Sequence, residues 1–499
     1  MGNIRLKREP KLASKHQAFS YQLEAIKAVR DLDYGAIFHE QGLGKSKIAI
    51  DIILYWLETK AVDTVILVVK KSLLANWERE LSEHCYVRPR ILTQNKNSNF
   101  HVLNSPARLI LTHFEAIKSE SPRLSMFLKT RYVGIVIDES AKLKNPESSL
   151  TKAFFKLSKQ FKRRVVMTGT PIANRPYDIW AQIWFLDQGL SLGNNFKEFK
   201  KDFDLTGELN SNSDKREAFE RNLASLFSRI SGFTVRETKN SGIINLPQKV
   251  YQNISAPWEQ KQNKLYTKIR DELRALVIKN GLPKEDEAEP LLKRMLRLTQ
   301  IASNPRLVDE SYEDEPGKFP VLLNLIQNIV HNNEKVIVWT NFTENADWLK
   351  SRLEAYGSVK VHGKLDMTSR NKAVTDFLKD DQCKVLVATP GAAKEGLTLT
   401  VANHVIFYDR GFSLDDYLQS QDRIHRISQK KTCYIYNLLM EHSIDEWTDR
   451  LLHSKELAAK LGQGDITQEY YSSEVSYNFT EMLIHVLNLD RTEIHEEEF

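Results

Sequence analysis

The sequence predicts an α/β fold with two parallel-sheet lobes and helical insertions. Three observations support it: short runs rich in Val and Ile recur in two sets, helix-like stretches separate these runs, and a middle region lacks them. Continuous apolar runs followed by helices are typical of buried parallel strands in βα units. Each set is large enough for its own core, so two lobes are expected.

Eight strands are expected from these runs. Four lie in the first part of the chain, at Gly35–Phe38, Val65–Val69, Gly134–Asp138 and Val165–Thr168. Four lie in the later part, at Lys335–Thr340, Lys384–Thr389, His404–Asp409 and Thr432–Leu439.

The regions 186–240 and 255–310 have helical apolar spacing and no strand runs, so we expect helical protrusions there. Ser241–Lys249 is a candidate crossing between the lobes, and Pro316–Gly317 is a second break. These signals predict an N-terminal lobe (1–185), a protrusion with the link (186–245), a protrusion of the second lobe (246–315), a C-terminal lobe (316–455) and a helical tail (456–499).

Composition excludes several protein classes. The 499 residues are 41% hydrophobic and 27% charged, which argues against wholesale disorder. A net charge of +6 permits nucleic-acid binding without demanding it. Cys85, Cys383 and Cys433 are too far apart in sequence to suggest a zinc knuckle or a disulfide-stapled secreted fold. No apolar run could span a membrane and the start lacks a secretory signal, so we expect an intracellular protein.

A glycine-rich loop, Gln41-Gly42-Leu43-Gly44-Lys45-Ser46, follows the first expected strand and opens an expected helix over Lys45–Leu57. In such a loop, the backbone N–H groups of Gly42, Leu43 and Gly44 would cradle the phosphates of ATP. Lys45 would reach the β- and γ-phosphates and Ser46 would ligate Mg²⁺. His39 stands where the general pattern has its first glycine, and the alternative is a glycine turn before an ordinary helix.

Asp138 and Glu139 end the third expected strand. Sheets of this kind bind ligands at the carboxyl ends of their strands. Asp138 would hold Mg²⁺ and Glu139 would polarise the attacking water. In isolation such a pair is more often a solvated turn, but the phosphate loop favours the catalytic interpretation.

In order, these residues and further segments resemble the motifs of SNF2-like superfamily 2 helicases and translocases, over roughly residues 18 to 450. In the first lobe the similar segments are Phe19–Gln22 (the adenine-reading Gln motif), His39–Ser46 (motif I), Val65–Trp77 (Ia), Leu111–Glu115 (Ib), Asp138–Asn145 (II), Met167–Pro171 (III) and Arg236–Lys239 with Leu246-Pro247 (the link). In the second lobe they are Val336–Phe342 (IV), Thr389–Thr400 (V) and Gln419–Gln429 (VI), the last being the most specific.

The resemblance implies two RecA-like lobes, with ATP between them and DNA across both. It implies that Gln22 binds the adenine base and that Gly396 binds the nucleotide. It also implies that four residues have a coupling role in the motor: Thr168, Gly169, Thr170 and Gln419. Thr112, Thr389 and Gly391 would border a DNA track that contacts the phosphate backbone and does not read base edges.

Arg423 and Arg426 lie three residues apart and on a helix would share one face. Inside the segment similar to motif VI, they are expected to act as arginine fingers on the γ-phosphate. The alternative is a solvated basic face.

The chain departs from the family pattern at three positions: Ala141 replaces the motif II His, Lys70 replaces a Pro and Ser428 replaces a Gly. None of these changes removes a phosphate, metal or water ligand. They bear on coupling and rate.

The sequence therefore predicts a monomeric DNA-dependent ATPase that moves along duplex or branched DNA in replication, repair or recombination. A compact bacterial or phage-type motor, in the cytoplasm or nucleoid, is favoured over a chromatin remodeller. A strand-separating fork helicase and an ATP-gated DNA clamp remain alternatives.

Overall fold

The computed structural model describes residues 6, 9–204, 209, 212–242, 246–280, 288–393, 398–475 and 486–487. The chain forms two compact units. Unit 1 contains the described residues of Met1–Thr206, Asp214–Asn245 and Ala458–Ser473, and unit 2 is built mainly from Leu246–Leu457. The C-terminal segment from Ala458 to Ser473, which we expected in a separate tail, thus belongs with unit 1.

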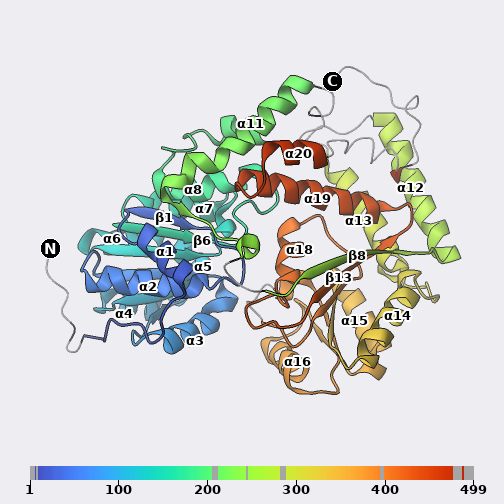
Figure 1. Cartoon of the computed structure of the whole chain (residues 1–499), viewed down its shortest axis with the longest axis horizontal. Helices are drawn as coiled ribbons and strands as arrows, with labels where there is room; N and C mark the ends of the chain where they lie inside the picture. The colour runs from blue at the N-terminus through green and yellow to red at the C-terminus, as the bar shows by residue number, and fades with distance from the viewer. Residues whose placement is uncertain are drawn as a thin grey trace. The chain divides into compact units, whose positions relative to one another are not determined.

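Unit 1 is built on a seven-stranded sheet in the order β3-β4-β2-β5-β6-β1-β7, and all of its strand pairs are parallel. Figure 1 labels β1 and β6 of this sheet. Its strands are β1 (Tyr34–Ile37), β2 (Thr64–Val69), β3 (Arg90–Leu92), β4 (Leu109–His113), β5 (Val133–Asp138), β6 (Arg163–Met167) and β7 (Thr234–Val235).

Helices accompany this sheet. α1 (Ser20–Val29) precedes the first strand, and α20 (Gln468–Glu474) lies near the C-terminus. Between the strands lie α2 (Lys45–Glu58), α3 (Leu74–His84), α4 (Lys96–Asn104), α5 (Phe114–Ser119), α6 (Ser121–Thr130), α7 (Ser149–Ser158), α8 (Trp180–Asp187), α9 (Phe196–Phe203) and α11 (Ser213–Ile230). The helix expected over Lys45–Leu57 is confirmed as α2.

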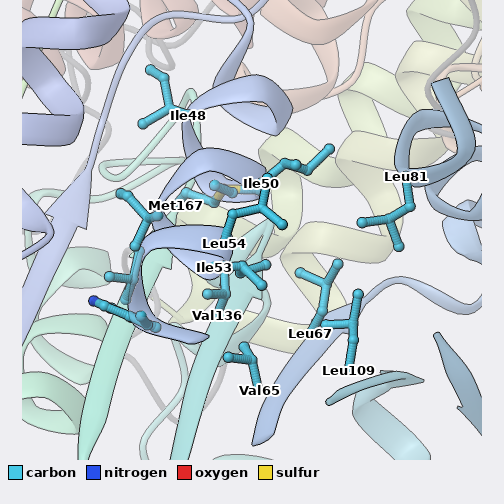
Figure 2. Close-up of a cluster of buried hydrophobic side chains, with 14 of the residues drawn as sticks. Ile48, Ile50, Ile53, Leu54, Val65, Leu67, Leu81, Leu109, Val136 and Met167 are labelled. Carbon is cyan, nitrogen blue, oxygen red and sulfur yellow. The ribbon is translucent and has the colours of Figure 1, made fainter. Parts of the chain in front are cut away.

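The core of unit 1 fixes the position of the glycine-rich loop. Side chains of α2, including Ile50, Ile53 and Leu54, pack on Val65 and Leu67 of β2 and on neighbouring strands (Figure 2). Every residue of β2 is buried, as expected for a strand covered on both faces. Both ends of the loop are therefore anchored, because β1 precedes it and α2 follows it.

Unit 2 is built on a six-stranded parallel sheet in the order β10-β11-β9-β12-β13-β8. Its strands are β8 (Lys249–Ala256), β9 (Val336–Trp339), β10 (Ser358–Val361), β11 (Val385–Ala388), β12 (His404–Phe407) and β13 (Cys433–Met440). Its helices are α12 (Gln260–Asn280), α13 (Ala288–Ser303), α14 (Lys318–His331), α15 (Thr343–Arg352), α16 (Met367–Lys379), α17 (Pro390–Ala393), α18 (Leu414–Gln421) and α19 (Ile444–Gly462), whose last residues belong to unit 1.

These two parallel sheets confirm the predicted fold class. All eight expected runs are strands, but β3, β4, β7, β8 and β10 were not among them. We expected helices and no strand in 186–240, and this was wrong. The region contains the two-residue strand β7, which pairs with β1 at the edge of the sheet. β8 gave no apolar run because it is an edge strand with an exposed middle. In the parts of the chain that the structure describes, no helix is long and apolar enough to cross a membrane.

Candidate nucleotide-binding site

The loop between β1 and α2 requires glycine at two positions. Gly42 and Gly44 both have positive φ values, 87° and 70°, which side-chain-bearing residues adopt at a cost. Gly44 is the N-cap of α2, and its carbonyl accepts from the N–H of Lys47 at 3.0 Å. The loop thus turns sharply into the helix N-terminus, which is the arrangement that binds phosphate groups.

Lys45 holds its ammonium over this loop. Its Nζ donates to the carbonyl oxygens of His39 at 2.9 Å and Glu40 at 3.2 Å. His39 is buried, and burial together with the nearby Lys45 charge lowers its pKa to about 4, so its imidazole is neutral at pH 7. Ser46, the next residue, is half-buried in the first turn of α2.

Gln22 of α1 lies against the same loop. Its Oε1 accepts from the backbone N–H of Phe19 at 2.9 Å, and its Nε2 faces the carbonyl of Leu43 at 3.5 Å. A β-carbon at Gly44 would overlap Gln22 Nε2, so the two residues are in close contact. The structure brings Gln22 to the loop, and its role toward adenine stays a prediction.

Asp138 ends β5, and both oxygens of its carboxyl group accept hydrogen bonds. Oδ2 accepts from the indole of Trp77 at 2.8 Å and Oδ1 from the backbone N–H of Glu139 at 2.9 Å. Desolvation, and then the charge of Glu139, raise the pKa of Asp138 to about 6. A bound cation would reverse this shift, so the residue fits the expected Mg²⁺ ligand. Sequence reasoning gave Trp77 no role here.

Glu139 has an unusual backbone conformation. Its φ of 54° places a side-chain-bearing residue in the left-handed region, which costs conformational energy and is one kind of strain that recurs at active sites. Its Oε1 lies 3.5 Å from Gln41 Nε2, and its Oε2 lies 4.0 Å from Lys70 Nζ. Lys70, noted in the sequence only as a departure, is therefore a neighbour of the predicted catalytic carboxylate.

The segment Thr168-Gly169-Thr170 lies directly on the glycine-rich loop. The Thr168 N–H donates to the carbonyl of Ile37 at 3.2 Å, and the Thr170 N–H donates to Thr168 Oγ1 at 3.2 Å. A β-carbon at Gly169 would overlap Gln41 Cγ and would lie 3.3 Å from Lys45 Nζ. Unit 1 thus brings this segment, the loop, Asp138 and Glu139 together.

Hydrogen bonds through Gln182 also join the segment that contains Glu139 to the segment that contains Gly169. Ser140, which follows Glu139, donates from Oγ to Gln182 Oε1 at 2.7 Å. Gln182 Nε2 donates to the carbonyl of Pro171 at 2.9 Å, two residues beyond Gly169. Sequence reasoning missed Gln182, although a glutamine inside the apolar run of α8 was the available signal.

The segment Arg236–Lys239 borders the start of the glycine-rich loop. Arg236 donates to the carbonyl of Phe38 at 2.8 Å and forms a two-pronged ion pair with Asp465. The Lys239 N–H donates to Glu40 Oε2 at 2.8 Å. The loop is therefore held from this segment as well as from α1.

In unit 2, Arg423 and Arg426 lie in turns and not on a helix, so their expected common helical face is wrong. The reason is that α18 ends at Gln421, with Asp422 as its C-cap. Arg423 is buried. Arg426 donates to the Asp422 carbonyl at 3.1 Å and to Thr398 Oγ1 at 2.7 Å. Gln419, on α18, donates to Asp415 at 2.6 Å.

The predicted DNA-contacting residues lie near strand ends. Thr112, in β4 of unit 1, is buried and donates to the carbonyl of Leu92 at 2.9 Å. In unit 2, Thr389 is buried just after β11, and Gly391 is exposed with open space around it. Gly396 lies outside the described residues. The DNA contacts of these residues stay predictions.

Protein-family models match most of the chain. A model of the SNF2-related domain matches residues 21–307, and a model of the helicase conserved C-terminal domain matches residues 317–428.

The chain is also similar to bacterial and animal proteins. The chain is 28% identical to an uncharacterized ATP-dependent helicase of Mycoplasma genitalium, 27% to the helicase/translocase YwqA of Bacillus subtilis, and 26% to a RAD54-like DNA repair and recombination protein of Drosophila pseudoobscura. These matches cover 88%, 91% and 90% of this chain but only 42%, 49% and 63% of the relatives. The chain therefore spans less than half of either bacterial relative.

A solved structure is also similar. The SWI2/SNF2 ATPase core of Sulfolobus solfataricus in complex with double-stranded DNA is 25% identical, with a TM-score of 0.42 over 97% of this chain and 100% of that one.

Proposed function

Because the chain belongs to the SNF2-related domain family, we propose that it hydrolyses ATP and uses the energy to move along duplex or branched DNA. The observation that carries this proposal is the site in unit 1. Lys45, Glu139 and Gly169, far apart in sequence, meet at one glycine-rich loop.

The residues of this site divide the chemistry of phosphoryl transfer. Backbone N–H groups from Gly42 to Lys45 bind the phosphates, and Lys45 stabilises the charge that develops on them. Glu139 orients and polarises the attacking water. Ser46 and Asp138 would hold Mg²⁺, which supplies charge neutralisation at the β- and γ-phosphates when bound.

Arg423 and Arg426 would complete the site from unit 2. An arginine finger stabilises negative charge on the transferring phosphoryl group. Since these two residues belong to a different unit from Glu139, hydrolysis would require the two units to close. DNA that binds both units would favour the closed state and so stimulate hydrolysis.

DNA would be bound through its phosphates, with Thr112, Thr389 and Gly391 bordering its path. Such contacts position the protein on the duplex but do not read its sequence. The names of the relatives, helicase/translocase and DNA repair and recombination protein, agree with this kind of motor.

The test is ATP hydrolysis by the purified chain, with and without linear and branched duplex DNA. We expect DNA to raise the rate severalfold, and Lys45→Ala to abolish turnover in both conditions. Wild-type turnover that does not respond to any DNA would contradict a DNA motor. Stimulation together with unwinding of forked DNA would favour the strand-separating alternative.

A further inference from the structure

Gln182 uses every hydrogen-bonding group of its side chain inside unit 1. It is fully buried in α8. Its Oε1 accepts from Ser140 Oγ at 2.7 Å, and its Nε2 donates to the carbonyls of Pro171 at 2.9 Å and Asp178 at 3.2 Å. An amide offers two N–H donors and one oxygen acceptor, so none of its groups is left unpaired.

This pattern permits only one orientation of the amide. The carbonyls of Pro171 and Asp178 can only accept, so the nitrogen of Gln182 must face them and its oxygen must face Ser140. The Ser140 hydroxyl must then donate. Removing the amide would leave buried groups on both sides without a partner, which is costly in a dry interior.

The two ends of this connection lie beside the reacting groups. Ser140 directly follows Glu139, whose backbone is held in the left-handed region. Pro171 lies two residues beyond Gly169, which is in close contact with Gln41 on the glycine-rich loop. Gln41 in turn approaches Glu139 at 3.5 Å, so the contacts form a closed circuit around the site.

We propose that Gln182 is a positioning residue that makes the segments of Glu139 and Gly169 move as one body during the ATP cycle. Ala141, next to Ser140, has no polar side-chain group that could link the two segments, and the hydrogen bonds of Gln182 supply this link. The inference rests on the proposed ATPase function and extends it to a residue that touches neither nucleotide nor metal.

The test compares Gln182→Leu, Ser140→Ala and the double variant with wild type. A matched control is Ser158→Ala, which removes another fully buried hydroxyl whose bond, to Phe155, stays within one helix. For each protein we would measure thermal unfolding, binding of a fluorescent ATP analogue, and kcat and KM for ATP with saturating duplex DNA.

We expect Gln182→Leu to lower the DNA-stimulated kcat by about 10- to 100-fold, the size of effect produced by small misplacements of reacting groups. Nucleotide affinity and KM should change little, because the hydrogen bonds of the Gln182 side chain go to Ser140, Pro171 and Asp178, which lie outside the loop. The double variant should unfold at a higher temperature than Gln182→Leu, since the unpaired Ser140 hydroxyl is gone, but should not regain kcat. Ser158→Ala should keep its full kcat.

A double variant that regained both stability and kcat would show that Gln182 acts only in folding and would overturn the inference. A stable Gln182→Leu with normal stimulated kcat would also overturn it. Wild-type protein that hydrolyses no ATP in the presence of DNA would instead refute the proposed function, so the two failures are distinguishable.

Discussion

Gly169 packs against Gln41 so closely that a β-carbon at Gly169 would overlap Gln41 Cγ and lie 3.1 Å from the Gln41 backbone nitrogen. Gly169→Ala should therefore displace either its own turn or the glycine-rich loop. We expect kcat for ATP to fall by about 10- to 100-fold, because a displacement of about 1 Å near reacting groups can cost that much. Steady-state ATPase assays would measure it.

Gly232→Ala is the matched control for this prediction. Gly232 also lies in unit 1, but a β-carbon there meets no atom within 4 Å. Its activity should equal that of wild type. Equal activity of Gly169→Ala and Gly232→Ala would show that the contact with Gln41 has no functional consequence.

Glu139→Gln should separate ATP binding from hydrolysis. The amide keeps the size of the side chain but cannot act as a base, so the variant should bind ATP and fail to turn it over. Lys45→Ala should instead lose β/γ-phosphate stabilisation and weaken binding. Binding of radiolabelled ATP on filters, beside a turnover assay, measures both. Normal hydrolysis by Glu139→Gln would refute its assigned role.

The raised pKa of Asp138 predicts a pH dependence of stability. Its pKa of about 6 in the folded chain exceeds the value of about 3.9 in an unfolded chain, so the folded state binds more protons between these values. The contribution of Asp138 to stability therefore falls as pH rises from about 4 to 6. Asp138→Asn should remove this part of the slope in unfolding experiments at stepped pH. An unchanged slope would contradict the assignment.

Arg426→Ala should leave ATP and DNA binding largely intact while it erases stimulation by DNA. An arginine finger is worth roughly 10³–10⁵ in rate. Without closure of the two units, ATP hydrolysis would therefore be very slow. Arg426→Lys should rescue poorly, because lysine lacks the planar two-pronged donor. Arg423→Ala should behave similarly. If the variant lacking both arginines still responded to DNA in the ATPase assay, the closure model would be wrong.

DNA affinity should fall steeply with salt and vary little with sequence. Each neutralised phosphate contributes a slope of about −0.9 to log K against log salt on duplex DNA. Fluorescence anisotropy with two unrelated duplexes, between about 50 and 200 mM salt, measures both dependences. A nearly flat salt response would argue against a groove that follows the phosphate backbone.

The sequence predicted the part of the site whose signals are local. The glycines before Lys45 and the apolar run before Asp138 are features of single segments, and both form the expected strand–loop elements. Gln182 stood out in the sequence only as a glutamine inside an apolar run. The partners of Gln182 and Trp77 could not be identified, because Ser140 and Asp138 lie 42 and 61 residues away in sequence. The spacing of Arg423 and Arg426 suggested a helix, but it contains no signal for the end of α18 at Gln421.

The central claim is that ATP hydrolysis drives movement along duplex DNA. The most direct test is displacement of a third strand from a triplex on blunt duplex DNA, because a motor that follows the duplex removes this strand without separating the other two. We predict displacement by wild type with ATP, and none without ATP or with Glu139→Gln. If wild type hydrolysed ATP in response to DNA but left the triplex intact, the protein would be an ATP-gated clamp and the account of a translocating motor would be wrong.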